Sequence, residues 1–224
     1  MKNPIIISLG GSIMVPDEVD TAYLKRFKDL ILKLSKKHPC ILVSGGGKTA
    51  RRYIKAARKF TKDQEAAHWL GISATHMNAQ LLKTILHPHC HKEILANPTK
   101  KQIIKKNIAI AAGWKPGCST DKDAVLLAKT YKAKTILNLS NIDYVYTKDP
   151  NKFKSAKRCI NLSWKELQNI VGLKFKPGEN YPFDPEATKL AMKQKLTLYC
   201  LNGRKLNEVK KAIQGKPFKG TLVL

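Results

Sequence analysis

Acidic residues are scarce in this sequence. Its 224 residues include 16 Asp and Glu against 42 Lys and Arg, which gives a formal net charge of +26. A field of this sign attracts nucleotides and polyanions. The basic residues are mostly Lys and are spread along the whole chain, without an arginine-rich block or interleaved aromatic residues. The charge alone therefore does not indicate a nucleic-acid-binding protein.

Long apolar runs and a regular cysteine framework are also missing. No run approaches the ~20 apolar residues of a membrane span, and the first residues do not resemble a signal peptide, so we expect a cytoplasmic protein without a membrane partner. The five cysteines are odd in number and scattered, which is typical of reduced thiols. The His and Cys residues at 87–91 lack a second ligand pair, so we expect a surface loop there instead of a zinc site.

The apolar residues follow two alternating patterns. Short aliphatic runs predict strands at residues 5–9, 40–43, 94–95, 108–112, 135–139, 196–201 and 221–224. Spacings of three and four, with their capping residues, predict helices at residues 20–37, 49–60, 63–86, 121–131, 163–172, 184–193 and 206–213. This alternation indicates an α/β protein, a three-layer sandwich with a mainly parallel central sheet flanked by helices, in a single domain.

Four polar or glycine-containing loops each follow a predicted strand. They span residues 10–12, 45–51, 113–121 and 140–149. Because ligand loops of parallel sheets gather at the carboxyl ends of the strands, we expect these four to meet at one edge.

The second of these loops has the character of an anion-binding turn. Gly45, Gly46 and Gly47 join a predicted strand to a helix, an arrangement that points backbone N–H groups at an anion. Arg51 follows one turn later and could reach phosphate oxygens. The loop is not a Walker A motif, because that motif needs glycine where this chain has Leu42.

Several motifs occur in one order along the chain. They are Leu9-Gly10-Gly11-Ser12, Gly45-Gly46-Gly47 with Arg51, Gly71 with Thr75 and Asn78-Ala79, Pro116 to Asp121, and Ser140-Asn141-Ile142-Asp143 with Val145-Tyr146-Thr147 and Asp149-Pro150. This ordered set resembles the amino acid kinase superfamily and, within it, the uridylate (UMP) kinases of the archaeal type. The resemblance extends over nearly the whole chain.

The resemblance implies a reaction and an organisation. The reaction is transfer of the γ-phosphoryl group of ATP to UMP, giving UDP and ADP in pyrimidine nucleotide biosynthesis, with Mg²⁺. An acceptor-binding lobe would span about residues 1–130, and an ATP-binding lobe about residues 131–224. The family usually assembles as a homohexamer, and we do not expect nucleic acid as a partner.

The resemblance also implies roles for individual residues. Contacts to ATP are expected from Gly11, Ser12, Gly47, Arg51, Ser140, Asn141, Tyr146 and Asp149. Contacts to UMP are expected from Gly46, His68, Trp114, Lys115, Pro116, Gly117, Cys118, Ser119 and Thr120. Catalytic roles are expected for Arg51, Asp121, Asp184 and Lys189. Asp121 would bind Mg²⁺ through water or orient a lysine, and no dedicated metal site is expected.

Some of these residues have simpler explanations that stay open at this point. Ser12, Ser119 and Ser140 could be plain helix caps. Asp184 and Lys189 could be a helix cap and a solvated lysine.

The sequence departs from the family pattern at positions that concern the acceptor. Ser8 replaces a lysine that many superfamily members carry, His68 stands where these kinases have an Asp that holds the UMP ribose, and Trp114 replaces a small residue. Tyr144 replaces a glycine of the family's Asp-Gly-Val-Tyr run. Two alternatives follow: a phosphotransferase with another acceptor, such as isopentenyl phosphate, or a catalytically weakened nucleotide sensor that binds nucleic acid. The first is disfavoured, because such relatives place a His near the glycine loop and residues 44–52 contain none.

Overall fold

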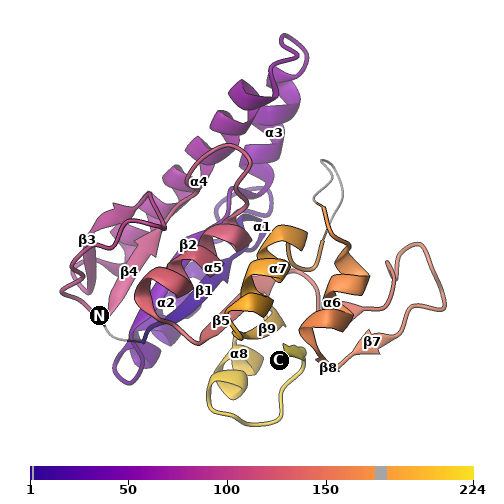
Figure 1. Ribbon diagram of the computed structural model, residues 1–224. Coiled ribbons are helices and arrows are strands. Elements are labelled where there is room, and N and C mark those ends of the chain that lie inside the picture. The colour runs from indigo at the N-terminus through magenta and orange to yellow at the C-terminus, as the bar shows by residue number, and fades with distance from the viewer. Residues whose placement is uncertain (2, 175–180) are drawn as a thin grey trace.

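A central sheet runs through the protein (Figure 1). The computed structural model describes residues 1, 3–174 and 181–224. Within them the strands of this sheet are β1 (Ile5–Leu9), β2 (Cys40–Ser44), β3 (Cys90–Leu95), β4 (Ile108–Ala111), β5 (Thr135–Ser140), β8 (Asn161–Leu162), β9 (Thr197–Asn202) and β10 (Thr221–Val223). They lie in the order β3-β4-β2-β1-β5-β9-β10-β8. Every neighbouring pair is parallel except β9 and β10, so the predicted mainly parallel sheet is confirmed.

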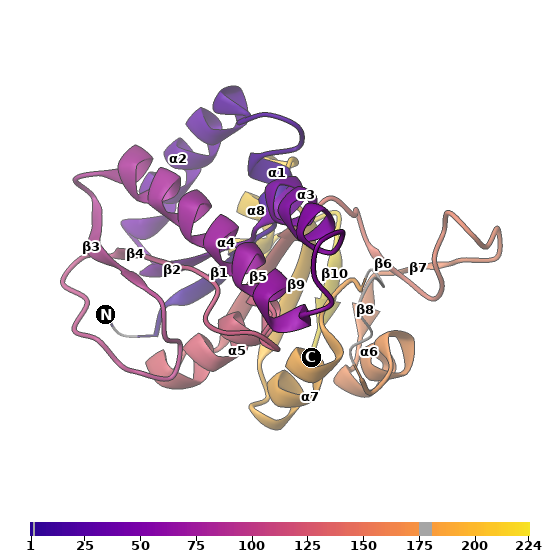
Figure 2. The ribbon, with the colours of Figure 1, turned by 90° about the horizontal axis from the view of Figure 1, so that it is seen from above.

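Helices cover both faces of the sheet. The described helices are α1 (Gly11–Met14), α2 (Thr21–Ser35), α3 (Gly47–Ala57), α4 (Gln64–Leu86), α5 (Thr120–Tyr131), α6 (Trp164–Val171), α7 (Pro185–Lys193) and α8 (Leu206–Ile213). Figure 2 shows α2, α4 and α8 on one side of the sheet and α5 and α7 on the other. The three-layer sandwich expected from the sequence is confirmed.

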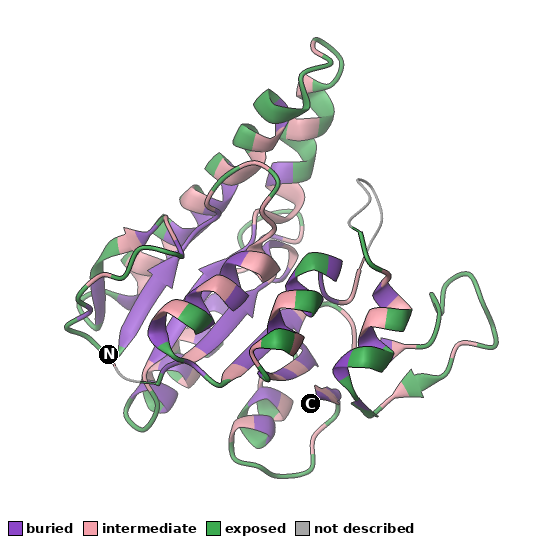
Figure 3. Ribbon diagram, viewed as in Figure 1, coloured by how far each residue is buried: buried purple, intermediate pink, exposed green. Residues whose placement is uncertain are grey.

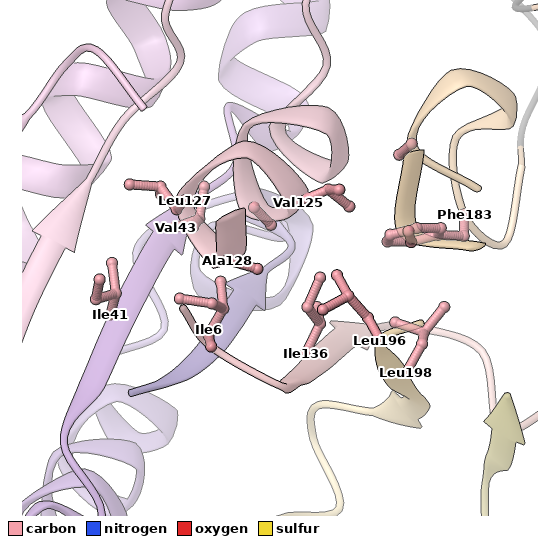
Figure 4. Close-up of a cluster of buried hydrophobic side chains, with 14 of the residues drawn as sticks. Ile6, Ile41, Val43, Val125, Leu127, Ala128, Ile136, Phe183, Leu196 and Leu198 are labelled. Atoms are coloured by element: carbon pink, nitrogen blue, oxygen red, sulfur yellow. The ribbon is translucent and has the colours of Figure 1, made fainter. Parts of the chain in front are cut away.

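Successive strand residues alternate between the two layers, as the period of two in a strand requires. Ile6, Ile41 and Ile136 are fully buried against α5 and α7, whereas Ile7 and Leu42 are buried against the helices of the opposite face. Figure 4 shows the first cluster, in which Val125, Leu127 and Ala128 of α5 pack over the strands. Both faces are apolar because a parallel sheet covered by helices has no solvated side.

Side-chain caps fix where several helices begin. Ser163 and Glu166 form a full capping box at the start of α6, as predicted. Asp184 accepts a hydrogen bond from the backbone N–H of Ala187 and so caps α7, with Pro185 at the first helical position. The starts of these elements could therefore be predicted from single residues.

The structure corrects the sequence prediction at one edge of the sheet. Residues 87–91 were predicted as a surface loop, but β3 begins at Cys90, and both Cys90 and His91 are buried. Cys90 pairs with Ile108 of β4, a contact between distant parts of the chain that the local His-rich composition does not reveal. The short helix α1 and the hairpin of β6 (Val145–Tyr146) and β7 (Arg158–Cys159) were also not predicted.

Helices α3 and α4 pack against each other and project beyond the sheet as a hairpin (Figure 1). Figure 3 shows that most of the outer part of this hairpin is exposed or partly exposed. No helix in the described part of the chain is long and apolar enough to cross a membrane.

Candidate active site

The four predicted ligand loops meet at one edge of the sheet. Strands β4, β2, β1 and β5 are adjacent and parallel, so the loops that follow them all leave from the same side. The predicted convergence is confirmed, and the remaining site geometry is built on it.

The loops after β1 and β2 touch through glycine. A Cβ atom added to Gly11 would lie 2.3 Å from the backbone nitrogen of Gly47, and one added to Gly47 would lie 2.5 Å from the carbonyl carbon of Gly11. Gly47 also has φ of +62°, a left-handed conformation that favours glycine. Two backbones can approach this closely only where neither residue carries a side chain. The contact leaves backbone groups, and not side chains, at the centre of the edge.

A buried amide from α4 holds the second loop in place. Asn78 Nδ2 donates a hydrogen bond to the carbonyl oxygen of Gly45 at 2.8 Å. A Cβ atom on Gly46 would meet the Ala50 side chain at 2.6 Å, so this glycine is also required by packing. Asn78 was named as part of a family motif but not as a site residue, and its role is to orient the loop.

Helix α3 begins directly at this loop. Its N-cap residue is Gly46, which offers no side chain to the first backbone N–H groups of the helix. Those N–H groups and the positive end of the helix dipole are therefore free for an anion. Arg51 lies one turn along α3 and is exposed, and its Nη2 donates to the hydroxyl oxygen of Ser12 at 2.9 Å. The structure thus brings Arg51, Ser12 and the two glycine loops together.

The loop from Trp114 to Cys118 is a tight turn. The Cys118 N–H donates to the carbonyl oxygen of Lys115, Pro116 occupies the second position, and Gly117 has φ of +76° at the third. This combination matches a type II turn. The ammonium group of Lys115 lies 4.2 Å from the centre of the Trp114 ring, where a cation–π interaction forms.

Helix α4 positions the start of the same loop. The backbone N–H of Gly113 donates to Thr75 Oγ1 at 2.8 Å, and His76 Nε2 lies 3.0 Å from the Gly113 carbonyl oxygen. Ser119 follows the turn and caps α5 by accepting from the N–H of Lys122, so the cap explanation for Ser119 describes what its hydroxyl does here. Thr120 is the first residue of that helix.

The carboxyl groups of Asp121 and Asp184 lie near each other where α5 and α7 pack together. Asp121 Oδ1 accepts from the Ser8 hydroxyl at 3.3 Å, and Asp121 Oδ2 accepts from the backbone N–H of Asp184 at 3.1 Å. The Asp121 residue is half-buried, but its carboxyl group faces inward toward these partners. Burial, and next the nearby Asp184 carboxyl, raise the pKa of Asp121 to about 7. No lysine contacts Asp121 in the described part of the chain.

One carboxyl group of the site was not predicted. Asp123 is fully buried in the first turn of α5, and it accepts hydrogen bonds from the backbone N–H of Trp114 and from the thiol of Cys118. The sequence gives little reason to single out Asp123, because acidic residues are common in the first turn of a helix.

The expected ATP-contacting residues after β5 form a second group. Ser140 Oγ is shielded and has no hydrogen-bond partner among the described residues. Asn141 is exposed and Tyr146 is half-buried in the small hairpin. Asp149 is exposed and accepts from the backbone N–H of Asn151, which makes it a turn residue as well.

Asp143 connects the loop after β5 to residues at and just after the end of β9. It accepts from Asn202 Nδ2 and Lys205 Nζ, each at 2.8 Å, and these partners hold the pKa of its carboxyl below the usual range. Asp143 was named in a motif but given no role, because its partners lie about 60 residues away in the sequence.

Two expected residues stay apart from these contacts. His68 lies in the second turn of α4, half-buried, without a hydrogen bond to any described residue. Lys189 is exposed on α7 and forms no hydrogen bond or ion pair within the described part of the chain. Their expected roles therefore stay predictions.

Comparisons with known proteins bear on the whole chain. The sequence model of the amino acid kinase family matches residues 3–202. The uridylate kinase of Pyrococcus abyssi is 33% identical over 222 residues, covering 98% of both chains. That of Methanosarcina barkeri is 36% identical over 203 residues, covering 89% of this chain and 87% of the other. The crystal structure of uridylate kinase from Archaeoglobus fulgidus aligns over both complete chains with a TM-score of 0.85 and 31% identity.

The shielded carboxyl group of Asp121 makes a prediction about stability. Because its folded pKa is raised, the folded protein holds a proton that the unfolded chain has lost, and stability falls as pH rises from about 4 to about 7. Asp121→Asn removes this penalty while keeping the acceptor oxygen for Asp184. We expect the variant to gain roughly 1–3 kcal/mol relative to the unmodified protein between pH 4 and pH 8.

Urea unfolding at pH 4.5, 6 and 8 measures this difference. Asp29→Asn, at an exposed position of α2, is the matched control and should show no such gain. A stability difference that is the same at all three pH values would contradict the assignment of a raised pKa to Asp121.

Proposed function

Since the chain belongs to the amino acid kinase family, we propose that it is a UMP kinase, which transfers the γ-phosphoryl group of ATP to UMP and gives UDP and ADP. Archaeal relatives that share about a third of its sequence over nearly its whole length are named uridylate kinases. The observation that carries the proposal is the meeting of two glycine loops and the starts of α3 and α5 at one edge of the sheet. Backbone N–H groups and helix starts gathered in this way suit the binding of phosphate groups.

Phosphoryl transfer asks the protein to align two nucleotides and to neutralise their charge. The acceptor phosphate would lie at the uncapped start of α3, against the backbone of Gly46, and Gly47 would face the donor phosphates. Thr120, at the start of α5, would approach the acceptor phosphate from the other side. The turn from Trp114 to Cys118 would close over the uridine, with Trp114 and Lys115 shaping that pocket and His68 reaching the ribose.

The donor nucleotide would lie on the β5 side of the same edge. Gly11 and Ser12 would contact its phosphates through backbone and hydroxyl groups, and Arg51 would bridge the donor and acceptor phosphates. The shielded hydroxyl of Ser140, which has no hydrogen-bond partner among the described residues, would bond to the nucleotide. Asn141, Tyr146 and Asp149 would hold the adenosine, with Asp149 accepting from ribose hydroxyls.

Magnesium fits this arrangement without a protein cage. The described residues include no group of three His, Cys, Asp or Glu that could hold a metal ion. Mg²⁺ commonly binds through substrate phosphates, waters and one or two carboxylates. When bound, it would neutralise phosphate charge. Of the two roles expected for Asp121, contact through water is the one its lysine-free surroundings support.

The proposal also includes the two lobes, the hexamer and the location expected from the sequence. The part of the sheet from β3 to β1 would serve the acceptor, and the part from β5 onward would serve ATP, in keeping with the expected lobes. Exposed apolar side chains on the α3–α4 hairpin, namely Tyr53, Phe60, Trp69, Leu70 and Met77, favour self-association there, and sedimentation velocity would report whether a hexamer forms. A cytoplasmic location follows from the substrates ATP and UMP.

The nucleic-acid alternative finds one supporting feature. A cavity of about 1150 Å³ between α2 and α8 is lined by eight Lys and Arg but only two acidic residues. It shares only Lys205 with the residues of the site described above, and no Phe, Tyr or Trp on which a base could stack is among its lining residues. We therefore keep phosphoryl transfer as the function.

The acceptor is tested by ADP release with ATP and Mg²⁺ across UMP, dUMP, CMP, AMP, GMP and isopentenyl phosphate. We expect a clear preference for UMP. Turnover with a different acceptor would preserve the ATP site but overturn the acceptor assignment. Folded protein that is inactive with every acceptor and binds RNA in a salt-dependent way would favour the sensor alternative.

Arg51 is the side chain that we expect to matter most for the rate. Arg51→Ala should lower kcat by about a hundredfold or more, because it removes a charged contact to the transferring group. Arg58→Ala is the matched control, since Arg58 is exposed near the end of the same helix and, among the described residues, its side chain bonds only to Gln64. A folded Arg51→Ala enzyme with nearly normal kcat would contradict the assigned role.

A further inference from the structure

The Trp114–Cys118 turn is held by one carboxyl group that neither the motifs nor the proposed reaction assigns. Asp123 Oδ2 accepts from the backbone N–H of Trp114 at 3.2 Å, and Asp123 Oδ1 accepts from the thiol of Cys118 at 3.0 Å. The two donors stand at the two ends of the turn. The Asp123 side chain therefore joins the two ends of the turn.

Burial of the Asp123 carboxyl lowers the stability of the fold unless its hydrogen bonds compensate. Asp123 has no exposed surface, and burial raises the pKa of its carboxyl to about 6. A carboxylate with no solvent contact destabilises a fold unless hydrogen bonds compensate it. The compensation here comes from the turn itself, together with the nearby ammonium group of Lys122 and the start of α5.

Other parts of the turn are less well fixed. Gly117 has open space around its Cα and gains nothing from packing. Lys115 and Gly117 are exposed, and Trp114 and Cys118 are only half-buried. One backbone bond closes the turn, and Thr75 and His76 hold the preceding Gly113, but the hydrogen bonds to Asp123 tie both Trp114 and Cys118 to helix α5.

We propose that Asp123 is a positioning residue for the acceptor: it holds the Trp114–Cys118 turn in the shape that receives UMP, without touching the nucleotide. The inference rests on the proposed function, because it places the turn at the acceptor site. It predicts an effect on acceptor binding that is separate from ATP binding. It also explains how a large Trp114 can stand beside the acceptor, since its backbone is fixed at the point where it enters the turn.

The test begins with steady-state kinetics. Asp123→Ala should raise the KM for UMP by about tenfold and leave the KM for ATP within about twofold, because only the acceptor turn is released. Asp123→Asn keeps one carbonyl oxygen for the Trp114 N–H and should give a smaller increase in the same direction. Asp29→Ala is the control, because it removes an exposed acidic residue of α2, on the opposite face of the sheet. It should change neither KM.

Thiol labelling gives a second readout, which reports on the turn itself and on whether UMP covers it. Burial, and next the Asp123 carboxyl, raise the pKa of the Cys118 thiol, so removal of that carboxyl should speed iodoacetamide labelling of Cys118, located by peptide mass spectrometry. UMP should slow this labelling in the unmodified protein. If Asp123→Ala does not fold, the same two measurements on Asp123→Asn decide.

The outcomes separate the two proposals. Folded Asp123 variants with an unchanged KM for UMP, in a protein whose Cys118 is shielded by UMP, would overturn the positioning role alone. If the protein phosphorylates UMP but UMP does not slow Cys118 labelling, the turn does not belong to the acceptor site. That result would overturn the inference together with that part of the proposed site. A loss of thermal stability with both KM values unchanged would make Asp123 only a structural residue.

Discussion

The contact between the two glycine loops is the constraint on which the site depends. Gly11 and Gly47 come so close that a methyl group on either would overlap the backbone of the other. The parallel register of β1 and β2 sets this approach, since Leu9 pairs with Ser44 where both strands end. Because side chains are excluded, the middle of the edge presents peptide groups and the start of α3. Such a surface suits phosphate groups, which accept hydrogen bonds from backbone N–H groups at close range.

The charges around this contact are distributed in two layers. Positive groups lie outside, with Arg51 exposed at the mouth of the site and a net charge of +26 on the whole chain. Carboxyl groups lie inside, with Asp121 and Asp123 shielded in the first turn of α5. The outer layer attracts nucleotides, and the inner layer organises the loops that meet them. The inner layer is costly for stability, as the raised pKa values of both carboxyl groups show, and such a cost is common where a site must be held in one geometry.

Much of the fold and part of the site could be predicted from local patterns. The alternation of strands and helices, the caps at Ser163 and Asp184, and the position of four loops at one edge all follow from neighbouring residues or from the rule for parallel sheets. Three features could not be predicted: the burial of Cys90 and His91 in β3, the hydrogen bonds from the Trp114–Cys118 turn to Asp123, and those from Asn202 and Lys205 to Asp143. Each of these depends on tertiary contacts. The last joins residues about 60 positions apart, and the spacing of residues along the sequence does not reveal such contacts.

The position of the two nucleotides is the central claim, and a crystal structure with UMP, ADP and Mg²⁺ bound would test it most directly. The account predicts the UMP phosphate at the start of α3, within about 3.2 Å of the Gly46 backbone nitrogen, with ADP on the β5 side of Arg51. UMP bound elsewhere, for example in the basic cavity between α2 and α8, would contradict it.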